Sequence, residues 1–178
     1  MTEQPLFAPP AKLMAAPKTG IERARATKRT EADMLDLLTA RYGPQQGVLR
    51  YVVARHVRSH AGFDARRTAD FVALDTWPSS GFVIHGHEVK VSRSDWLHEL
   101  KQPEKAAEFM LYMDFWWLVV SDASIVREDE LPDGWGLMAV RGDKLVALCQ
   151  APKRKPLPLT TTRIAAFVRA VAKTAGAA

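Results

Sequence analysis

The sequence predicts one α/β domain built on a mixed β-sheet that is flanked by helices. Short apolar runs bounded by turn residues, such as residues 115–120, are typical of buried strands. Segments with apolar residues at helical spacing alternate with these runs. The chain has 178 residues, of which 47% are hydrophobic and 25% charged, so it has the size and composition of a single globular domain.

Each expected element has a local signal. Thr30, followed by Glu31 and Asp33, predicts a capped helix that ends at the turn Tyr42-Gly43-Pro44. Apolar residues at helical spacing predict a second helix over residues 46–60. Strands are expected over 71–74, 82–91 and 115–120, helices over 92–100, 104–113 and 162–172, and a hairpin over 136–150.

Charge divides the chain into three parts. The net charge is +5, with +5 over residues 1–60, −4 over 61–122 and +4 over 123–178. Basic flanks around an acidic centre suit a surface that binds a polyanion and holds a cation in its middle, although a solvated surface with random charges has the same balance. We expect a flexible basic arm over 1–28, the α/β domain over 29–150, and a basic linker with a C-terminal helix over 151–178.

The composition also narrows the setting of the protein. Cys149 is the one cysteine, which excludes an intrachain disulfide and a zinc site made of several cysteines. The longest apolar stretch is far shorter than the about 20 residues that cross a bilayer. Residues 1–16 are broken by prolines and lack the features of a secretory signal. We therefore expect a reducing, cytoplasmic setting and no membrane partner.

Asp70 and the run His87-Glu88-Val89-Lys90-Val91 carry the functional signal. Alternate residues of a strand share a face, so Glu88 and Lys90 should point to one side of the sheet. An acid and a lysine within an apolar strand are costly to bury unless they pair or bind a ligand. If the strand of Asp70 lies alongside, two carboxylates and an ammonium converge. Such a set can hold Mg²⁺, while the lysine orients or helps to deprotonate a water and offsets charge on a phosphate.

Asp70, seventeen intervening residues and Glu88-Val89-Lys90 resemble the motif of the PD-(D/E)XK nuclease superfamily. The runs 67–71 and 88–96, then Lys105 and 112–120, look like its MmcB-like DNA-repair branch and related phage proteins, over about residues 48–140. The pattern departs from the family in three places. Ala69 stands where the motif has proline, four extra residues lie between Asp95 and Lys105, and the strand expected before Asp70 is hard to find between Gly62 and Thr68.

The resemblance implies a restriction-endonuclease-like core that hydrolyses DNA phosphodiesters with Mg²⁺ or Mn²⁺, in DNA repair, recombination or phage DNA processing. By that resemblance, Asp70, Glu88 and the backbone carbonyl of Val89 would hold the metal. Lys90 would serve the attacking water and the transition state. DNA is the expected partner, and Lys153-Arg154-Lys155 would supply phosphate contacts that weaken with salt.

Several residues near the motif have two interpretations. Arg66, Arg67 and Arg93 could hold phosphates or only pair with neighbouring acids. Asp75 could replace Asp70 as a ligand, and Glu31 could add one or only favour the start of its helix. A further pair, Glu108 and Tyr112, is similar to a Gln-x-x-x-Tyr motif of RecB-like nucleases, although the spacing also suits simple helix packing.

Other function classes remain open at this point. Glu88 and Lys90 could form only a cross-strand ion pair. His85 and His87 share a strand face and could bind zinc or iron as in cupins, although Glu88 points the other way and no third histidine follows at a suitable spacing. The fold could also serve a non-catalytic DNA-binding or regulatory module, or a structural phage protein that binds a partner through Trp77.

Overall fold

The structure is a computed structural model that describes residues 28–61, 67–102, 104–127 and 129–177. Except for its last residue, the basic arm expected over 1–28 lies outside the described residues. The described strands are β1 (Tyr51–Arg58), β2 (Thr68–Asp75), β3 (Ile84–Lys90), β4 (Phe115–Val120), β5 (Gly136–Arg141) and β6 (Lys144–Cys149). The described α-helices are α1 (Glu31–Arg41), α2 (Arg93–Glu99), α3 (Glu104–Met110) and α4 (Thr161–Gly176).

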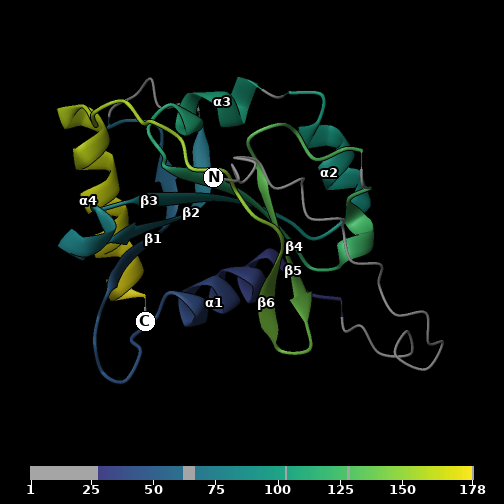
Figure 1. The fold of residues 1–178 in the computed structure, drawn as a ribbon, viewed down its shortest axis with the longest axis horizontal. Helices are drawn as coiled ribbons and strands as arrows, with labels where there is room; N and C mark the ends of the chain where they lie inside the picture. Colours follow the sequence, from purple (N-terminus) through teal and green to yellow (C-terminus); the bar gives the residue numbers. More distant parts are fainter. Residues whose placement is uncertain (1–27, 62–66, 103, 128, 178) are drawn as a thin grey trace, which may run out of the picture.

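The six strands form one mixed sheet whose order, β1 to β6, is the order of the strands in the chain. The pairs β1–β2, β2–β3 and β5–β6 are antiparallel, whereas β3–β4 and β4–β5 are parallel. Helix α1 covers one face of the sheet, and α2, α3 and α4 pack on the other (Figure 1). The prediction of an α/β domain with a mixed, helix-flanked sheet is therefore confirmed.

Strand β4 lies at the centre of both hydrophobic cores. Trp116 belongs to the core under α2, α3 and α4, and Trp117 belongs to the core under α1. Each ring lies over a glycine of a neighbouring strand and occupies the space of a side chain there. A Cβ added at Gly86 would come within 2.4 Å of Trp116, and one added at Gly136 within 2.4 Å of Trp117. The two glycines thus make room for the two largest side chains of the sheet.

Helix α1 begins where the sequence predicts. The Thr30 side chain accepts a hydrogen bond from the Asp33 amide, and the Asp33 carboxylate accepts one from the Thr30 amide, which completes a capping box. Met34, Leu35 and Leu38 then face the sheet and are buried. The first turn, which carries Glu31, is fixed by this cap.

The helix predicted over 46–60 is wrong, because residues 51–58 form the strand β1. This strand lies next to the strand of Asp70 in the sheet and ends before the interval between Gly62 and Thr68, where the nuclease pattern predicts it. Ala54 and Val57 both face the α4 side, although they are three positions apart and would point to opposite faces of a regular strand. The backbone turns over between them at His56, whose φ is +51°, and the β1–β2 pairing skips this residue. That interruption produces an apolar spacing of three, which imitates a helix.

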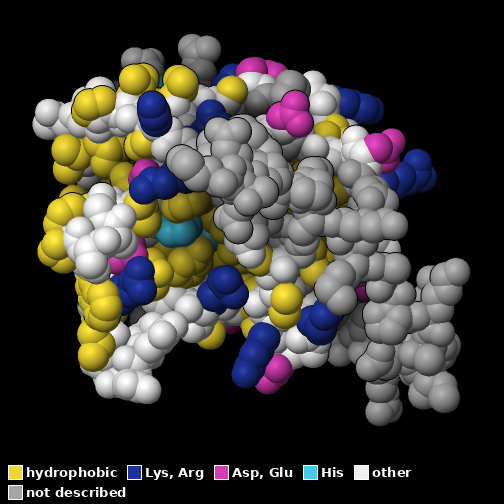
Figure 2. Space-filling model, viewed as in Figure 1, with side chains coloured by type: hydrophobic (Ala, Val, Ile, Leu, Met, Phe, Trp, Pro, Cys, Tyr) yellow, Lys and Arg dark blue, Asp and Glu magenta, His cyan; other side chains and the backbone are white. Residues whose placement is uncertain are grey.

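Helix α4 covers the outer strand of the sheet. The Arg55 amide on β1 donates a hydrogen bond of 2.9 Å to the Thr174 hydroxyl, and Ala170 joins the core. The outward side of α4 exposes Ile164 and Val168, and hydrophobic side chains gather there at the left of Figure 2. Among the described residues, no helix has both the length and the apolar character needed to cross a membrane.

Candidate functional site

Asp70 lies where strands β2 and β3 separate. Their pairing runs from Leu74 opposite Ile84 to Phe71 opposite His87. Beyond this point the Val89 amide donates to the Asp70 carboxylate, with 2.7 Å between N and Oδ2, while β2 stays paired with β1 as far as Thr68. The fork between β2 and β3 therefore holds a carboxylate in place of a backbone hydrogen bond.

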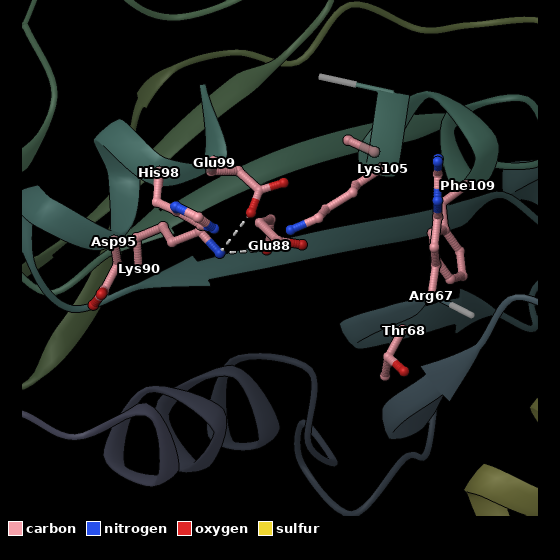
Figure 3. A pocket seen from close by; sticks show the side chains of 10 residues that line it. Arg67, Thr68, Glu88, Lys90, Asp95, His98, Glu99, Lys105 and Phe109 are labelled. Atoms are coloured by element: carbon pink, nitrogen blue, oxygen red, sulfur yellow. Dashed lines mark hydrogen bonds and ion pairs between the residues drawn. The ribbon is translucent and has the colours of Figure 1, made fainter. Parts of the chain in front are cut away.

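Glu88 and Lys90 point from β3 into a cavity of about 450 Å³ between the sheet, α2 and α3 (Figure 3). Their common direction agrees with the strand alternation expected from the sequence. The cavity wall combines acidic, basic and apolar side chains. Its lining residues are Arg67, Thr68, Glu88, Lys90, Asp95, His98, Glu99, Lys105, Ala106 and Phe109.

Lys90 is held between two carboxylates. Its Nζ lies 2.5 Å from Oε1 of Glu88 and 3.2 Å from Oε2 of Glu99 (Figure 3). All three side chains are between 10% and 13% exposed. Glu99 stands at the end of α2, and sequence reasoning missed it because an acid at a helix end is usually solvated. Its spacing of three residues from the buried Trp96, which places both on one helix face, is the signal that could have found it.

Burial and charge repulsion shape the ionisation of these groups. Burial, together with the negative charge of Asp70, raises the pKa of Glu88 to about 8. Burial also raises the pKa of Asp70, against the opposing effects of the Val89 amide and the Lys90 charge. Burial alone would lower the pKa of Lys90, but the carboxylates of Glu88, Glu99 and Asp70 outweigh it and raise that pKa. The raised pKa of Glu88 shows that its charge and that of Asp70 oppose each other, and a cation that replaces the proton of Glu88 would relieve this repulsion.

The Val89 carbonyl faces the same fork as Asp70. The Lys90 carbonyl accepts a hydrogen bond from the amide of Ser121, which follows β4. Successive residues of a strand direct their backbone groups to opposite sides, so the amide and the carbonyl of Val89 both point toward β2, where the amide binds Asp70. Asp70, Glu88 and this carbonyl offer oxygen donors of the kind that Mg²⁺ and Mn²⁺ take. The residues present therefore fit the metal that the sequence pattern implies.

A second group of possible ligands meets Asp70 from the α1 side. One ligand atom each from Glu31, His56 and Asp70 lie within 4.8 Å of one another. The Nδ1 of His56 is 3.9 Å from Oε1 of Glu31, which is too long for a hydrogen bond but suits two ligands of one ion. Within the described ranges, this is the group of three side chains whose ligand atoms lie close enough together to hold one metal ion. His56 was missed in the sequence because the expected helix placed it elsewhere.

The arginines proposed as phosphate contacts have different positions. Arg67 lines the cavity, where its guanidinium binds the Glu104 carbonyl and lies 3.8 Å from Glu108. Arg93 instead pairs with Glu130 and the Ile125 carbonyl, so its side chain is engaged away from the cavity. Arg66 lies outside the described residues.

The other candidates have structural partners. Asp75 is buried and accepts hydrogen bonds of 2.9 and 2.5 Å from Arg50, so this alternative to Asp70 is occupied by an ion pair. Glu108 accepts a hydrogen bond of 3.0 Å from Arg163 of α4, whose guanidinium carbon lies 3.9 Å from the centre of the Tyr112 ring. Glu108 and Tyr112 therefore contact α4.

His85 and His87 belong to the aromatic core under α1. His87 is fully buried between Tyr42 and Phe71, and His85 stacks on Phe115 with 4.8 Å between ring centroids. Burial lowers the pKa of His85 to about 4 and that of His87 to about 3, so both rings are neutral at pH 7. Aromatic neighbours surround the pair, an arrangement unlike the zinc or iron site considered for it.

Comparisons with known proteins add a likeness of fold. No protein-family model matches the chain, and no curated protein does. A solved structure from Silicibacter pomeroyi, the SPO1766 protein of unknown function, matches with a TM-score of 0.52 and 20% sequence identity. The match covers 82% of this chain and 84% of that protein. At this identity the likeness concerns the fold alone.

Proposed function

We propose that the protein is a metal-dependent nuclease that hydrolyses DNA phosphodiesters at the fork between β2 and β3. One observation carries the proposal: the Asp70 carboxylate is fixed on the amide of Val89, the residue between Glu88 and Lys90. Glu88 and Lys90 line the cavity, whereas Asp70 is not among its lining residues. An ion pair that served only the fold would gain nothing from a further buried acid whose charge opposes Glu88. A cation that binds both carboxylates removes this repulsion.

Asp70, Glu88 and the Val89 carbonyl would hold Mg²⁺ or Mn²⁺, which when bound polarises the phosphate and acidifies the attacking water. In the metal-free protein the carboxylates of Glu88, Glu99 and Asp70 raise the pKa of Lys90. Next to the metal, the Lys90 ammonium would orient the water and offset negative charge on the phosphate. The water oxygen would form a bond to phosphorus as one P–O bond of the backbone breaks, without a covalent intermediate on the chain. The proton that the water loses would pass to solvent, and the leaving oxygen would take up a proton.

The surroundings of the cavity suit a nucleic-acid backbone. Arg67, the residue before β2, and Lys105 of α3 both line the cavity (Figure 3). Lys153 and Lys155 are exposed, whereas Arg154 is bound to the Met110 carbonyl. Lys and Arg side chains are also spread over the face shown in Figure 2. These charges support salt-dependent DNA binding in repair, recombination or phage DNA processing, in a cytoplasmic setting.

The test measures cleavage of labelled linear, circular, single-stranded and branched DNA with Mg²⁺, with Mn²⁺ and with EDTA. We expect metal-dependent cleavage that falls by about 100-fold or more in Lys90→Ala, since this change removes a charge aimed at the reacting phosphate. Lys101→Ala, which changes an exposed lysine just beyond α2, is the matched control. DNA that is bound but never cut by the wild-type protein would reject the nuclease and favour the non-catalytic DNA-binding module.

A further inference from the structure

Two acids that line the cavity, Asp95 and Glu99, lie outside the nuclease motif, and of these Glu99 is the buried one. It is 8% exposed, and its carboxylate lies 3.2 Å from the Lys90 ammonium. A buried carboxylate is unfavourable unless it is paired, so the position of Glu99 depends on Lys90. The dependence is mutual, because Lys90 is buried to the same degree.

Lys90 and a bound cation would compete for Glu88. The ammonium is 2.5 Å from Oε1 of Glu88, which is one of the oxygens that the metal needs. Once a dication occupies Glu88 and Asp70, an ammonium held only by Glu88 would face a like charge at close range. Lys90 then needs a second acceptor that keeps it in the cavity and away from the metal ligands.

Glu99 meets this requirement by its placement. It approaches Lys90 from α2, whereas Glu88 belongs to the same strand as Lys90 (Figure 3). Helix α2 is anchored by Trp96, which is fully buried and packs edge-on against Trp135 with 6.2 Å between ring centroids. The carboxylate of Glu99 is therefore presented by a rigid element that does not include the metal ligands.

We propose that Glu99 is a positioning residue that holds the Lys90 ammonium in the cavity and so frees Glu88 to bind the metal. This inference rests on the metal centre of the proposed function, but it makes a statement about metal affinity that does not require DNA cleavage. Without the Glu99 charge, Lys90 remains on Glu88 and opposes the cation. Without Lys90, the identity of residue 99 should matter much less.

The experiment is a double-mutant cycle read by calorimetric titration of the metal-free protein with Mn²⁺. Glu99→Gln should weaken Mn²⁺ binding by about ten-fold in the wild-type background, as expected for a residue that orients a metal-site neighbour. In the Lys90→Met background the same change should weaken binding less than about two-fold, because the competing ammonium is gone. Glu104→Gln removes an exposed acid of α3 and serves as the control for charge alone.

Equal effects of Glu99→Gln in the two backgrounds would overturn the inference, because they would show a distant charge effect and no action through Lys90. A wild-type protein that binds no Mn²⁺ would overturn both this inference and the metal centre. Coupled Mn²⁺ binding without DNA cleavage would support the inference and reject only the nuclease. Urea unfolding shows whether each variant is folded. If Glu99→Gln does not fold, Glu99→Asp replaces it. Its shorter side chain moves the carboxylate away from Lys90, so it should also weaken Mn²⁺ binding.

Discussion

The buried His87 should make the stability of the protein sensitive to acid. The carbonyl of Phe71, 3.2 Å from Nδ1, can only accept a hydrogen bond, so the neutral ring donates from Nδ1 and accepts at Nε2 from the Tyr42 hydroxyl, 2.9 Å away. Burial lowers the pKa of His87 to about 3 in the folded protein, whereas an unfolded histidine has a pKa of about 6.5. Between these values the unfolded chain takes up a proton that the folded protein refuses. Stability is therefore full above pH 6.5 and is lost as the pH falls.

The size of this effect follows from the two pKa values. Two units below the unfolded pKa, at pH 4.5, His87 should lower the free energy of unfolding by about 2.5 kcal/mol relative to pH 7. Urea unfolding at both pH values compares the wild type with His87→Gln, which keeps a donor and an acceptor but does not titrate. The stability difference between the two proteins, in which the other titrating groups cancel, should shift by about 2.5 kcal/mol in favour of the variant at pH 4.5.

His98→Gln, at an exposed position of α2, controls for the loss of an imidazole as such. A difference between wild type and His87→Gln that is the same at pH 7 and pH 4.5 would refute the reasoning. His87 would then become charged as easily in the folded protein as in the unfolded chain.

Two other predictions concern packing and the choice of metal. Gly86→Ala should lower the free energy of unfolding in urea by about 1–3 kcal/mol, because the new Cβ would lie 2.4 Å from the ring of Trp116. Gly176→Ala is the control and should not destabilise the protein, because its Cβ would meet no atom within 4 Å. An equal loss of stability in the two variants would contradict the packing argument. His56→Asn should reduce binding of Zn²⁺ or Mn²⁺ more than that of Mg²⁺, since imidazole nitrogen favours transition metals and asparagine tolerates the positive φ of this position. Calorimetry with each metal measures this preference, and an equal loss for all three would exclude a direct role of the ring.

The sequence predicts well those elements whose signals are local. The Thr30 and Asp33 cap, the apolar run of β4 and the alternation that sends Glu88 and Lys90 to one side all depend on neighbouring residues. The structure agrees in each case, because the physical cause lies within a few residues of the signal.

The errors arise where the cause is distant in the chain. The interruption at His56 depends on the pairing of β1 with β2, and it turns a strand pattern into an apparent helix pattern. Glu99 reaches Lys90 only because the packing of α2 brings a helix end over β3. Arg93 lies close to Glu88 and Lys90 in the sequence, which suggests a phosphate contact, but its guanidinium pairs with Glu130, which lies far along the chain. The spacing of Glu99 from Trp96 indicates that Glu99 faces the core, but no local pattern shows its partner Lys90, the partner of Arg93 or the interruption at His56.

The strand order of the sheet has a consequence for how the chain folds during synthesis. Each strand pairs with its neighbours in the chain, so the sheet can extend stepwise while later residues are still being made. Helix α4 is the exception, because it follows all six strands in the chain and packs on the first of them. Until α4 arrives, β1 is an open edge with unpaired amides such as that of Arg55, which invites pairing with another chain. The hydroxyl of Thr174 accepts the hydrogen bond of one of these amides, so we expect α4, once it has packed on β1, to make this edge less available for pairing with another chain.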